Sequence, residues 1–407
     1  MHIVYVCREF PSSLRGGGIA SYLKEIAHAM VIYGHQVTVI CANDDTRKGT
    51  DMVMDGIRVI RLSGGNFIIP SIEKTNFIRK FRVFYRFFSY RLKIEMVLKK
   101  LGHIDIIECA DYGAESICLH HLNVPITIRL HMPSFFDLNT LTMKKFSWRL
   151  FPFKYLAYLE KKEIMWCKYI TSCSDALKDW TCTNLRIPEE NIHSIPNPCN
   201  SSFVKMINKG ADILDTSLIN VVCVGTICET KGCGDLIEAC LALKKSYANL
   251  HLWFFGKIGD WGYMIKKKYD AEKWIHFYGK IPRENLAGIY KNADVVALPS
   301  WFDNFPMTCL EAMMVKGVVL GSAAGGMTQM IQDGVNGFII PPKNVECLKD
   351  ALNKILSLNN EQIGNIRNKA EAFVMNNFET EIVTSKMIDY YTYVINDFYS
   401  KNEGSIY

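Results

Sequence analysis

Short runs rich in β-branched residues alternate with longer helix-like stretches along most of this chain. The first run, HIVYVC (2–7), is followed by a stretch at 19–33 whose apolar residues recur at helical spacing and which ends at Gly34. The next run is HQVTVICA at 35–42. This spacing predicts a helix between two buried strands, and glycine is a common helix stop. Repeated β-α-β alternation predicts a parallel sheet with helices on both faces.

The alternation occurs in two series. The first ends near residue 200, and after a pause the second begins with LINVVCVGT at 218–226. We therefore predict an α/β protein of two doubly wound, Rossmann-like domains, residues 1–200 and 218–380, with a linker at 201–217 and closing helices at 381–407 that return toward the first domain. Open α/β sheets bind ligands at the carboxyl ends of their strands, so two such domains are expected to face a central cleft.

Length and composition support a two-domain cytoplasmic protein. The chain has 407 residues, and no stretch reaches the roughly 18 consecutive apolar residues that a membrane-spanning helix needs. The start, MHIVYVCREFPSS, predicts a strand and not a signal peptide. Fourteen cysteines are scattered without a CxxC pair, which favours reduced thiols over a metal cluster among Cys223, Cys228, Cys233 and Cys240.

Two carboxylates stand out in PSWFDNFPMTCLEAM (299–313), where Asp303 follows a strand-like run and Glu311 lies on the helix predicted to begin near Pro306. Free amides from Phe305 to Thr308 at the helix start favour a phosphate. Carboxylates touching that phosphate would repel it, so we expect the two acids to accept hydrogen bonds from sugar hydroxyls. The alternative is an ordinary loop cap and a solvated helix residue.

Two neighbouring stretches point to the same cleft. VGTICETKG (224–232) places Lys231 after a strand, where a compact ammonium suits a diphosphate, although an exposed lysine is the usual case. AAGGMTQMIQDGVNGFIIPP (323–342) adds a glycine pair after another strand, which lets the backbone approach a ligand closely.

The continuous run from Tyr290 to Pro342 resembles the C-terminal signature of glycosyltransferase family 4, the retaining nucleotide-sugar glycosyltransferases of the GT-B fold. The acid-x7-acid motif of that family falls on Asp303 and Glu311. The resemblance implies that Glu311 binds the donor ribose, that Asp303 contacts the donor sugar and that Lys231 holds the diphosphate. It assigns donor binding to Gly17, Gly18, Thr226, Lys231, Asp303, Asn304, Phe305, Pro306, Met307, Thr308 and Glu311.

The first half resembles the family in shorter pieces. GGGIASYLKEIAHAMVIYGHQVTVI (16–40) is similar to the N-terminal glycine loop and helix, which would place Gly17 and Gly18 against the donor phosphates. TIRLHMPS (127–134) is similar to the strand that ends in a histidine near the reaction centre, here His131. The resemblance therefore implies four catalytic residues: His131, Lys231, Asp303 and Glu311. A histidine in this place is either structural or contacts the donor sugar through its ring or its backbone carbonyl, and we do not expect a general base.

Three positions depart from the family pattern. Asp303 stands where glutamate is commoner, Thr226 where arginine is frequent, and Gln329 where an acid is usual. Aspartate is one methylene shorter, so its loop must approach the donor more closely or contact a different hydroxyl. Arg8 or Arg15 could replace the missing charge partner of the diphosphate.

The segment KTNFIRKFRVFYRFFSYRLKIEMVLKKLG (74–102) contains nine Lys and Arg residues but only one acid, Glu95. A helical wheel puts Phe77, Phe81, Phe84, Phe88 and Leu92 on one face, and Arg79, Arg82, Arg86, Lys93 and Lys100 on the other. Such a helix either packs on the first sheet with a solvated basic face or meets anionic lipid headgroups or a lipid-pyrophosphate acceptor. We expect no nucleic-acid role, because no binding motif accompanies the charge.

We therefore predict a retaining glycosyltransferase that moves a hexosyl or N-acetylhexosaminyl group from a UDP- or GDP-linked donor to a glycan or lipid-linked acceptor. The resemblance suggests bacterial surface polysaccharide synthesis, in the cytoplasm or peripherally at the inner face of the cell membrane. No cofactor and no metal are expected, because Lys231 and helix amides can stabilise the leaving diphosphate. The alternatives are a GT-B sugar-nucleotide epimerase and a non-catalytic partner subunit that keeps the fold.

Overall fold

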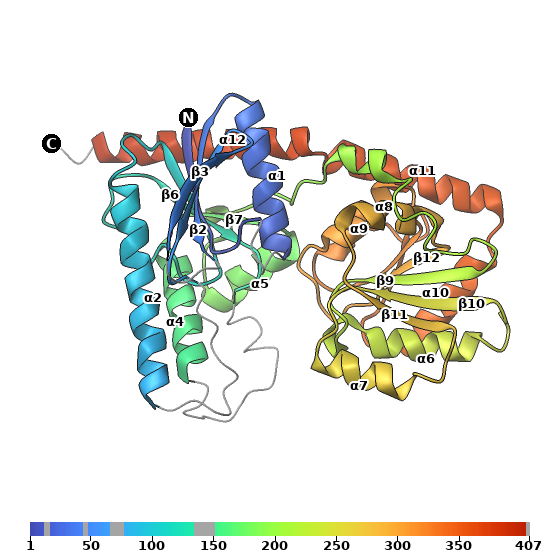
Figure 1. Ribbon diagram of the computed structural model, residues 1–407. Helices are drawn as coiled ribbons and strands as arrows, with labels where there is room; N and C mark the ends of the chain where they lie inside the picture. The colour runs from blue at the N-terminus through green and yellow to red at the C-terminus, as the bar shows by residue number, and fades with distance from the viewer. Residues whose placement is uncertain (12–16, 44–47, 66–76, 134–150, 404–407) are drawn as a thin grey trace. The chain divides into compact units, whose positions relative to one another are not determined.

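A computed structural model describes residues 1–11, 17–43, 48–65, 77–133 and 151–403 (Figure 1). The chain divides into two compact units, which are considered one at a time below. Unit 1 comprises Met1–Pro198 and Val383–Tyr407, and unit 2 comprises Cys199–Ile382. Each unit contains one twisted sheet with helices on both faces, as the alternation in the sequence predicts (Figure 1).

The sheet of unit 1 has eight strands in the order β3-β4-β2-β1-β5-β6-β7-β8, and only β3 is antiparallel to its neighbour. The strands are β1 (His2–Val6), β2 (Gln36–Ala42), β3 (Thr50–Met54), β4 (Ile57–Leu62), β5 (Ile106–Ala110), β6 (Ile126–Leu130), β7 (Tyr169–Ser172) and β8 (Ile192–Ser194). The helices are α1 (Gly18–Ile32), α2 (Phe77–Leu98), α4 (Phe151–Trp166), α5 (Asp175–Leu185), the 3-10 turn η3 (Glu189–Asn191) and most of α12 (Thr380–Glu403).

The central strands of unit 1 are buried on both faces, as their unbroken apolar runs require. All five residues of β1, β5 and β6 are buried. One face packs against α1 and α12, including Val383, Met387 and Val394, and the other packs against α2 through Tyr90, Ile94 and Leu98. The last helix of the chain is therefore part of the core of unit 1.

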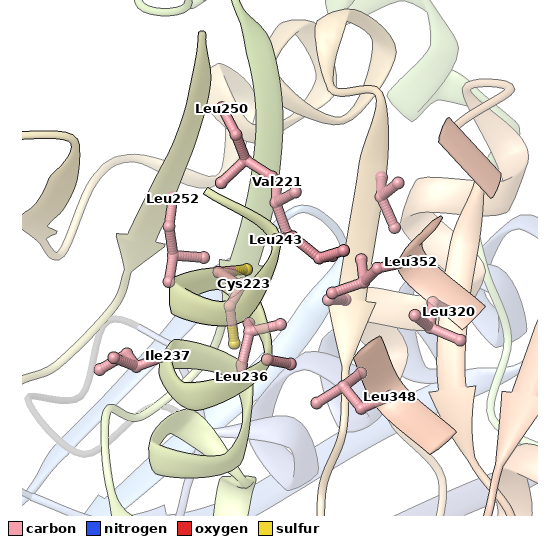
Figure 2. Close-up of a cluster of buried hydrophobic side chains, with 14 of the residues drawn as sticks. Val221, Cys223, Leu236, Ile237, Leu243, Leu250, Leu252, Leu320, Leu348 and Leu352 are labelled. Carbon is pink, nitrogen blue, oxygen red and sulfur yellow. The ribbon is translucent and has the colours of Figure 1, made fainter. Parts of the chain in front are cut away.

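The sheet of unit 2 is entirely parallel, with the order β11-β10-β9-β12-β13-β14. Its strands are β9 (Ile219–Val224), β10 (Leu250–Phe255), β11 (Ile275–Gly279), β12 (Val295–Leu298), β13 (Val319–Ser322) and β14 (Phe338–Ile340). Its helices are η4 (Ser201–Met206), η5 (Glu229–Lys231), α6 (Cys233–Leu243), α7 (Asp260–Lys268), α8 (Arg283–Asn292), α9 (Met307–Met314), η6 (Gly326–Gln329), α10 (Val345–Leu356) and α11 (Asn360–Asn377). Figure 2 shows the core between this sheet and α6 and α10, where Val221, Leu236 and Leu348 are fully buried.

The segment predicted as a linker, 201–217, lies within unit 2. It begins with η4, which packs against α8. The Gly288 amide donates to the Lys209 carbonyl at 3.2 Å, and the Asn292 side chain donates to the Ala211 carbonyl at 2.8 Å. The low periodicity of the segment therefore reflects irregular structure held by α8, not an unpacked connection.

Helix α2 packs through a different face from the one the wheel suggested. Phe87, Tyr90, Ile94 and Leu98 are buried, and Arg91 between them is fully buried as well. Phe88 and Leu92, from the predicted apolar face, are 40% and 53% exposed. The buried face can include Arg91 because its guanidinium donates to the Ala114 and Phe87 carbonyls, both at 2.7 Å. The predicted apolar residues Phe77, Phe81 and Phe84 lie outside the described side chains.

Candidate functional site

The loops that follow β9 and β12 lie against each other at the carboxyl edge of the sheet in unit 2. The Trp301 amide donates to the Thr230 carbonyl at 2.9 Å. Gly232 has a φ of +67°, and a Cβ there would lie 2.1 Å from the Pro299 carbonyl oxygen. A side chain at this position would push the two loops apart, so glycine keeps the residues after each strand close together.

Lys231 and Asp303 are brought into direct contact, with the Lys231 ammonium donating to Asp303 Oδ2. Their side chains are 34% and 17% exposed, so the pair remains accessible from solvent. Burial alone would lower the pKa of Lys231, but the Asp303 carboxylate raises it above its ordinary value. Lys231 therefore presents a full positive charge at neutral pH.

The predicted glycine pair after β13 also lies at this edge. The Gly326 amide donates to the Asp303 carbonyl at 3.0 Å. Gly325 has a φ of +70°, and a Cβ on it would lie 2.0 Å from that carbonyl oxygen. The glycine pair therefore holds the backbone of Asp303, and the loops after β9, β12 and β13 form one cluster.

The residues between the two acids begin α9, as the sequence predicted. Pro306 is the N-cap, and no side chain caps the helix. Asn304, Phe305 and Pro306 are buried, whereas Met307 and Thr308 are partly exposed. The Phe305 ring packs against Phe378, 5.7 Å away, so it faces the interior of unit 2. Phe305 could contact a ligand only through its backbone, which is the role that the sequence assigned to this turn.

Glu311 lies on α9 and is held by a residue that the sequence analysis missed. Arg283, the first residue of α8, donates from Nε to Glu311 Oε1 at 2.7 Å. The Glu311 side chain is 7% exposed and that of Arg283 is 40% exposed. The sequence could have drawn attention to Arg283 because it begins a helix shortly after a strand, at the end of the turn GKIPR. Nothing in that turn indicated a contact with Glu311.

Gly17 and Gly18 lie in unit 1, where Gly17 is the N-cap of α1 and Gly18 is its first residue. Both glycines are exposed. A Cβ on Gly17 would lie 3.5 Å from Glu9 Oε2, and a Cβ on Gly18 would meet nothing within 4 Å. Neither glycine is required by local packing, so their small size leaves open space at the helix start.

His131 follows β6 in unit 1 and is fixed by Asp111, which follows the adjacent strand β5. The His131 amide donates to Asp111 Oδ2 at 2.9 Å, and the imidazole lies edge-on to Tyr22 with 5.0 Å between ring centroids. Burial and the nearby Arg129 charge hold the pKa of His131 well below its ordinary value. The imidazole is therefore neutral at pH 7. Asp111 could have been found as an acid directly after a buried strand.

The structure places two of the residues that depart from the family pattern, and one of the two arginines suggested as a replacement charge. Thr226 is exposed after β9, and Gln329 ends η6. Arg8 does not suit the diphosphate role, because its Nε donates to the fully buried Glu115 at 2.9 Å. Arg15 lies outside the described residues. Among the predicted site residues, the structure joins Lys231 to Asp303, places Glu311 one helix behind them, and puts Gly17, Gly18 and His131 in the other unit.

All fourteen cysteines are free thiols. Within the described parts of the chain, no group of three or more His, Cys, Asp or Glu side chains is arranged to hold a metal ion. In the same parts of the chain, no helix is both long enough and apolar enough to cross a membrane.

Two family models match the chain. The model described as Glycosyltransferase Family 4 matches residues 16–203, and the model described as Glycosyl transferases group 1 matches residues 211–373. An uncharacterized glycosyltransferase of Methanocaldococcus jannaschii is 25% identical over 370 residues, which is 88% of this chain and 89% of the relative. A D-inositol 3-phosphate glycosyltransferase of Kribbella flavida is 38% identical over 88 residues, covering 22% of this chain and 21% of the relative.

Solved structures share the fold across both units. Sucrose-phosphate synthase from Thermosynechococcus elongatus has a TM-score of 0.77 and 18% identity, and the match covers 98% of this chain and all of the other. The Anabaena protein HepE, solved in complex with UDP, has a TM-score of 0.68 and 16% identity over 96% of this chain and 99% of the other.

Proposed function

The chain belongs to glycosyltransferase family 4 and has the GT-B fold, and on that premise we propose that it transfers a sugar from a nucleotide-sugar donor to an acceptor hydroxyl with retention at the anomeric carbon. The observation that carries the proposal is the cluster at one sheet edge of unit 2, where Lys231 contacts Asp303 ahead of the helix that bears Glu311. This cluster combines a cation, free helix amides and two acceptor carboxylates, which are the groups that a sugar diphosphate needs.

Each part of the donor has a proposed partner. Glu311 accepts hydrogen bonds from the ribose hydroxyls, and Asp303 accepts one from the transferred sugar. Lys231 and the amides at the start of α9 bind the diphosphate, with Asn304 and Thr226 beside it. In unit 1, Gly17 and Gly18 leave room for the donor phosphates, and neutral His131 contacts the sugar through its ring or its carbonyl.

The proposed reaction uses the leaving group as its base. The bond from the anomeric carbon to the diphosphate oxygen breaks, and its electron pair stays on the diphosphate. The acceptor oxygen bonds to the same face of that carbon, and its proton passes to the departing phosphate oxygen. Lys231 stabilises the charge that develops on the diphosphate. Because a protein cation does this, we expect transfer to continue when a chelator such as EDTA removes divalent metal ions.

The donor is proposed to be a UDP- or GDP-linked hexose or N-acetylhexosamine, and the acceptor a glycan or a lipid-linked glycan of a bacterial surface polysaccharide pathway. The test incubates purified protein with UDP-, GDP- and ADP-sugars, with and without acceptor extract, and measures nucleotide release and product anomer. Acceptor-dependent release with a retained anomer is expected. Epimer formed from donor alone would identify an epimerase, and the absence of both binding and release would support a non-catalytic subunit.

We also propose that the protein is cytoplasmic and that α2 attaches it to the inner face of an anionic membrane. Its residues Tyr85, Phe88, Leu92 and Met96 are 70%, 40%, 53% and 58% exposed and form one stripe, because they recur at helical spacing. The exposed Arg86, Lys99 and Lys100 flank that stripe. An apolar stripe with basic neighbours suits the interface of an anionic bilayer.

Vesicle co-sedimentation tests this attachment. The wild-type protein is expected to bind phosphatidylglycerol vesicles and to bind phosphatidylcholine vesicles far less. Replacing Phe88 and Leu92 by Ser should abolish most of that binding. Val53→Ser is the matched control, because Val53 is 71% exposed on β3 of the same unit. Equal binding of the double variant and the wild type would exclude the stripe as the contact.

A further inference from the structure

Arg283, at the start of α8, contacts the second acid of the motif. Its Nε donates to Glu311 Oε1 at 2.7 Å. Glu311 is nearly buried, and an ionised carboxylate in such a place is costly unless a charge partner compensates it. Arginine suits this task because its guanidinium is planar and always charged. The pair therefore compensates the charge of Glu311 and limits the orientation of its carboxylate.

The guanidinium of Arg283 is held in turn by Phe203 on η4. Its central carbon lies 5.4 Å from the centroid of the Phe203 ring, and Phe203 is buried. The Phe203 and Tyr290 rings lie 6.3 Å apart. Arg283 is thus positioned from two sides, by the carboxylate it contacts and by the aromatic ring it covers.

A second polar group is buried in the same place. Tyr290 is seven residues after Arg283 on α8, so the two side chains lie on one face of that helix. The Tyr290 hydroxyl is buried and has no hydrogen-bond partner within the described part of the chain. Burial, the Glu311 charge and other groups raise the pKa of Tyr290 well above its ordinary value, so it remains a neutral donor. A buried hydroxyl without a partner beside a fixed carboxylate points to a site for a polar ligand group.

We infer that Arg283 is the positioning residue for ribose recognition: it fixes the Glu311 carboxylate so that this carboxylate can accept hydrogen bonds from both ribose hydroxyls of a nucleoside diphosphate. This inference rests on the proposed function. A carboxylate offers about four acceptor positions, so a bond to Arg283 Nε leaves capacity for hydroxyl donors. Arg283 acts through Glu311 and makes the site select ribose over deoxyribose.

Calorimetric titration with UDP and 2′-deoxy-UDP tests the inference, with the GDP and ADP pairs run beside them. The wild-type protein is expected to prefer the ribonucleotide, because a site built for a hydroxyl rejects the analogue that lacks it. In Arg283→Met, ribonucleotide affinity should fall about tenfold or more, while affinity for the 2′-deoxyribonucleotide, which offers Glu311 only its 3′-hydroxyl, should fall less, so the ratio of the two affinities decreases. The affinity ratio of Arg283→Lys should lie between those of the wild type and Arg283→Met, since lysine keeps the charge and loses the planar fork. This variant replaces Arg283→Met in the test if the Met variant does not fold.

A double-mutant cycle separates positioning from a merely structural ion pair. If Arg283 acts through Glu311, adding Arg283→Met to Glu311→Gln should leave the ribose-to-deoxyribose affinity ratio unchanged. Glu371→Gln is the matched control: it breaks the Lys316–Glu371 pair of the same unit, with a 3.1 Å contact, and should not alter the ratio.

Three results would overturn the inference. In Arg283→Met, a ratio equal to that of the wild type would make the pair a structural contact between α8 and α9. Tighter ribonucleotide binding by that variant would make Arg283 a competitor for Glu311. A wild-type protein that binds no nucleotide of any base would overturn the proposed function as well, so the two failures are distinguishable.

Discussion

At the scale of single residues, the two acids of the motif have cationic partners of different kinds. Asp303 meets the ammonium of Lys231, and Glu311 meets the guanidinium of Arg283. An ammonium is a compact point charge that can turn toward a phosphate, whereas a guanidinium presents a fixed planar fork. The Lys231 pair is therefore suited to rearrange when a donor binds, and the Arg283 pair is suited to persist.

Replacing Glu311 by Gln should reduce kcat/KM for transfer roughly 100-fold, because a neutral amide forms weaker hydrogen bonds to ribose hydroxyls than a carboxylate does. Gln keeps the volume of the side chain, so the circular dichroism spectrum should not change. Steady-state kinetics with the best donor gives the measurement. Turnover near the wild-type value would remove Glu311 from the site.

Replacing Lys231 by Met should weaken binding of UDP about tenfold or more and leave binding of uridine nearly unchanged, since the ammonium is proposed to contact only the diphosphate. Asp303, without its partner, would add repulsion toward the phosphates. Calorimetry with both ligands measures the difference. Lys349→Met is the control, because Lys349 pairs with Glu346 on α10. The diphosphate role fails if UDP and uridine lose affinity equally.

The sequence predicted the positions of those site residues whose place depends on a nearby strand. Lys231 and Asp303 each follow a buried strand, and parallel strands place such residues at one edge. Arg283 was missed because its partner lies 28 residues later and an arginine at a helix start is ordinary on a surface. Asp111 also follows a buried strand directly, but its role was not predictable, because it accepts the His131 amide, a long-range contact that leaves no spacing pattern.

At the scale of elements, a buried polar cluster joins α2 and α4 to the loop after β5. Glu163 on α4 accepts the Ser116 amide at 2.5 Å, and Glu160 accepts the Gly113 amide at 2.7 Å. Arg91 on α2 donates to the Ala114 carbonyl of the same loop. The helical wheel could not identify this face of α2, because a wheel sorts side chains by polarity and assigns an arginine to the solvent side. Arg91 is buried instead, since its guanidinium donates to backbone carbonyls inside unit 1.

This cluster gives unit 1 a pH-dependent stability. Burial raises the pKa of Glu163 to about 8 from an ordinary value of 4.5, although the Ser116 amide and Arg91 act against that shift. The folded protein therefore holds a proton that the unfolded chain releases between these pH values. The contribution of Glu163 to the free energy of unfolding falls as pH rises from about 4.5 to 8, and it is complete only at the acid end of that window.

Glu163→Gln cannot ionise and should flatten that decline, by at most about 1.4 kcal/mol per pH unit. The decline should not vanish, because the pKa values of Glu115, Glu108 and Asp111 are also raised by burial. Urea unfolding at pH 5 and at pH 8, followed by circular dichroism, compares the two proteins. If the urea midpoint changed equally between pH 5 and pH 8 in the wild type and in Glu163→Gln, the assignment to Glu163 would be contradicted.

At the scale of the whole molecule, the chain passes from unit 1 to unit 2 after Pro198 and returns after Ile382, within α12. The returning helix completes a buried polar centre in unit 1. Tyr391 donates to Glu108 Oε2 at 2.7 Å, and Tyr22 of α1 donates to Glu108 Oε1 at 3.1 Å. The two series of strands indicated the domain pattern, and the sequence analysis predicted closing helices that return toward the first domain. The Tyr391–Glu108 hydrogen bond itself was not predictable, because it joins residues 283 positions apart.

Ending the chain after Ile382 should therefore destabilise unit 1 and spare unit 2. Unit 1 would lose five buried hydrophobic side chains, those of Val383, Met387, Tyr390, Tyr391 and Val394. At about 1.5–3 kcal/mol each, their loss is comparable to the roughly 5–15 kcal/mol that stabilises a whole domain. Limited proteolysis should leave a protected fragment close to residues 199–382, while residues 1–198 are digested. Tyr391→Phe, which removes only the hydroxyl that donates to Glu108, should lower the stability of unit 1 by about 1–3 kcal/mol without exposing it to protease. If the truncated protein protects both units as the full chain does, α12 is an accessory helix and not part of the core of unit 1.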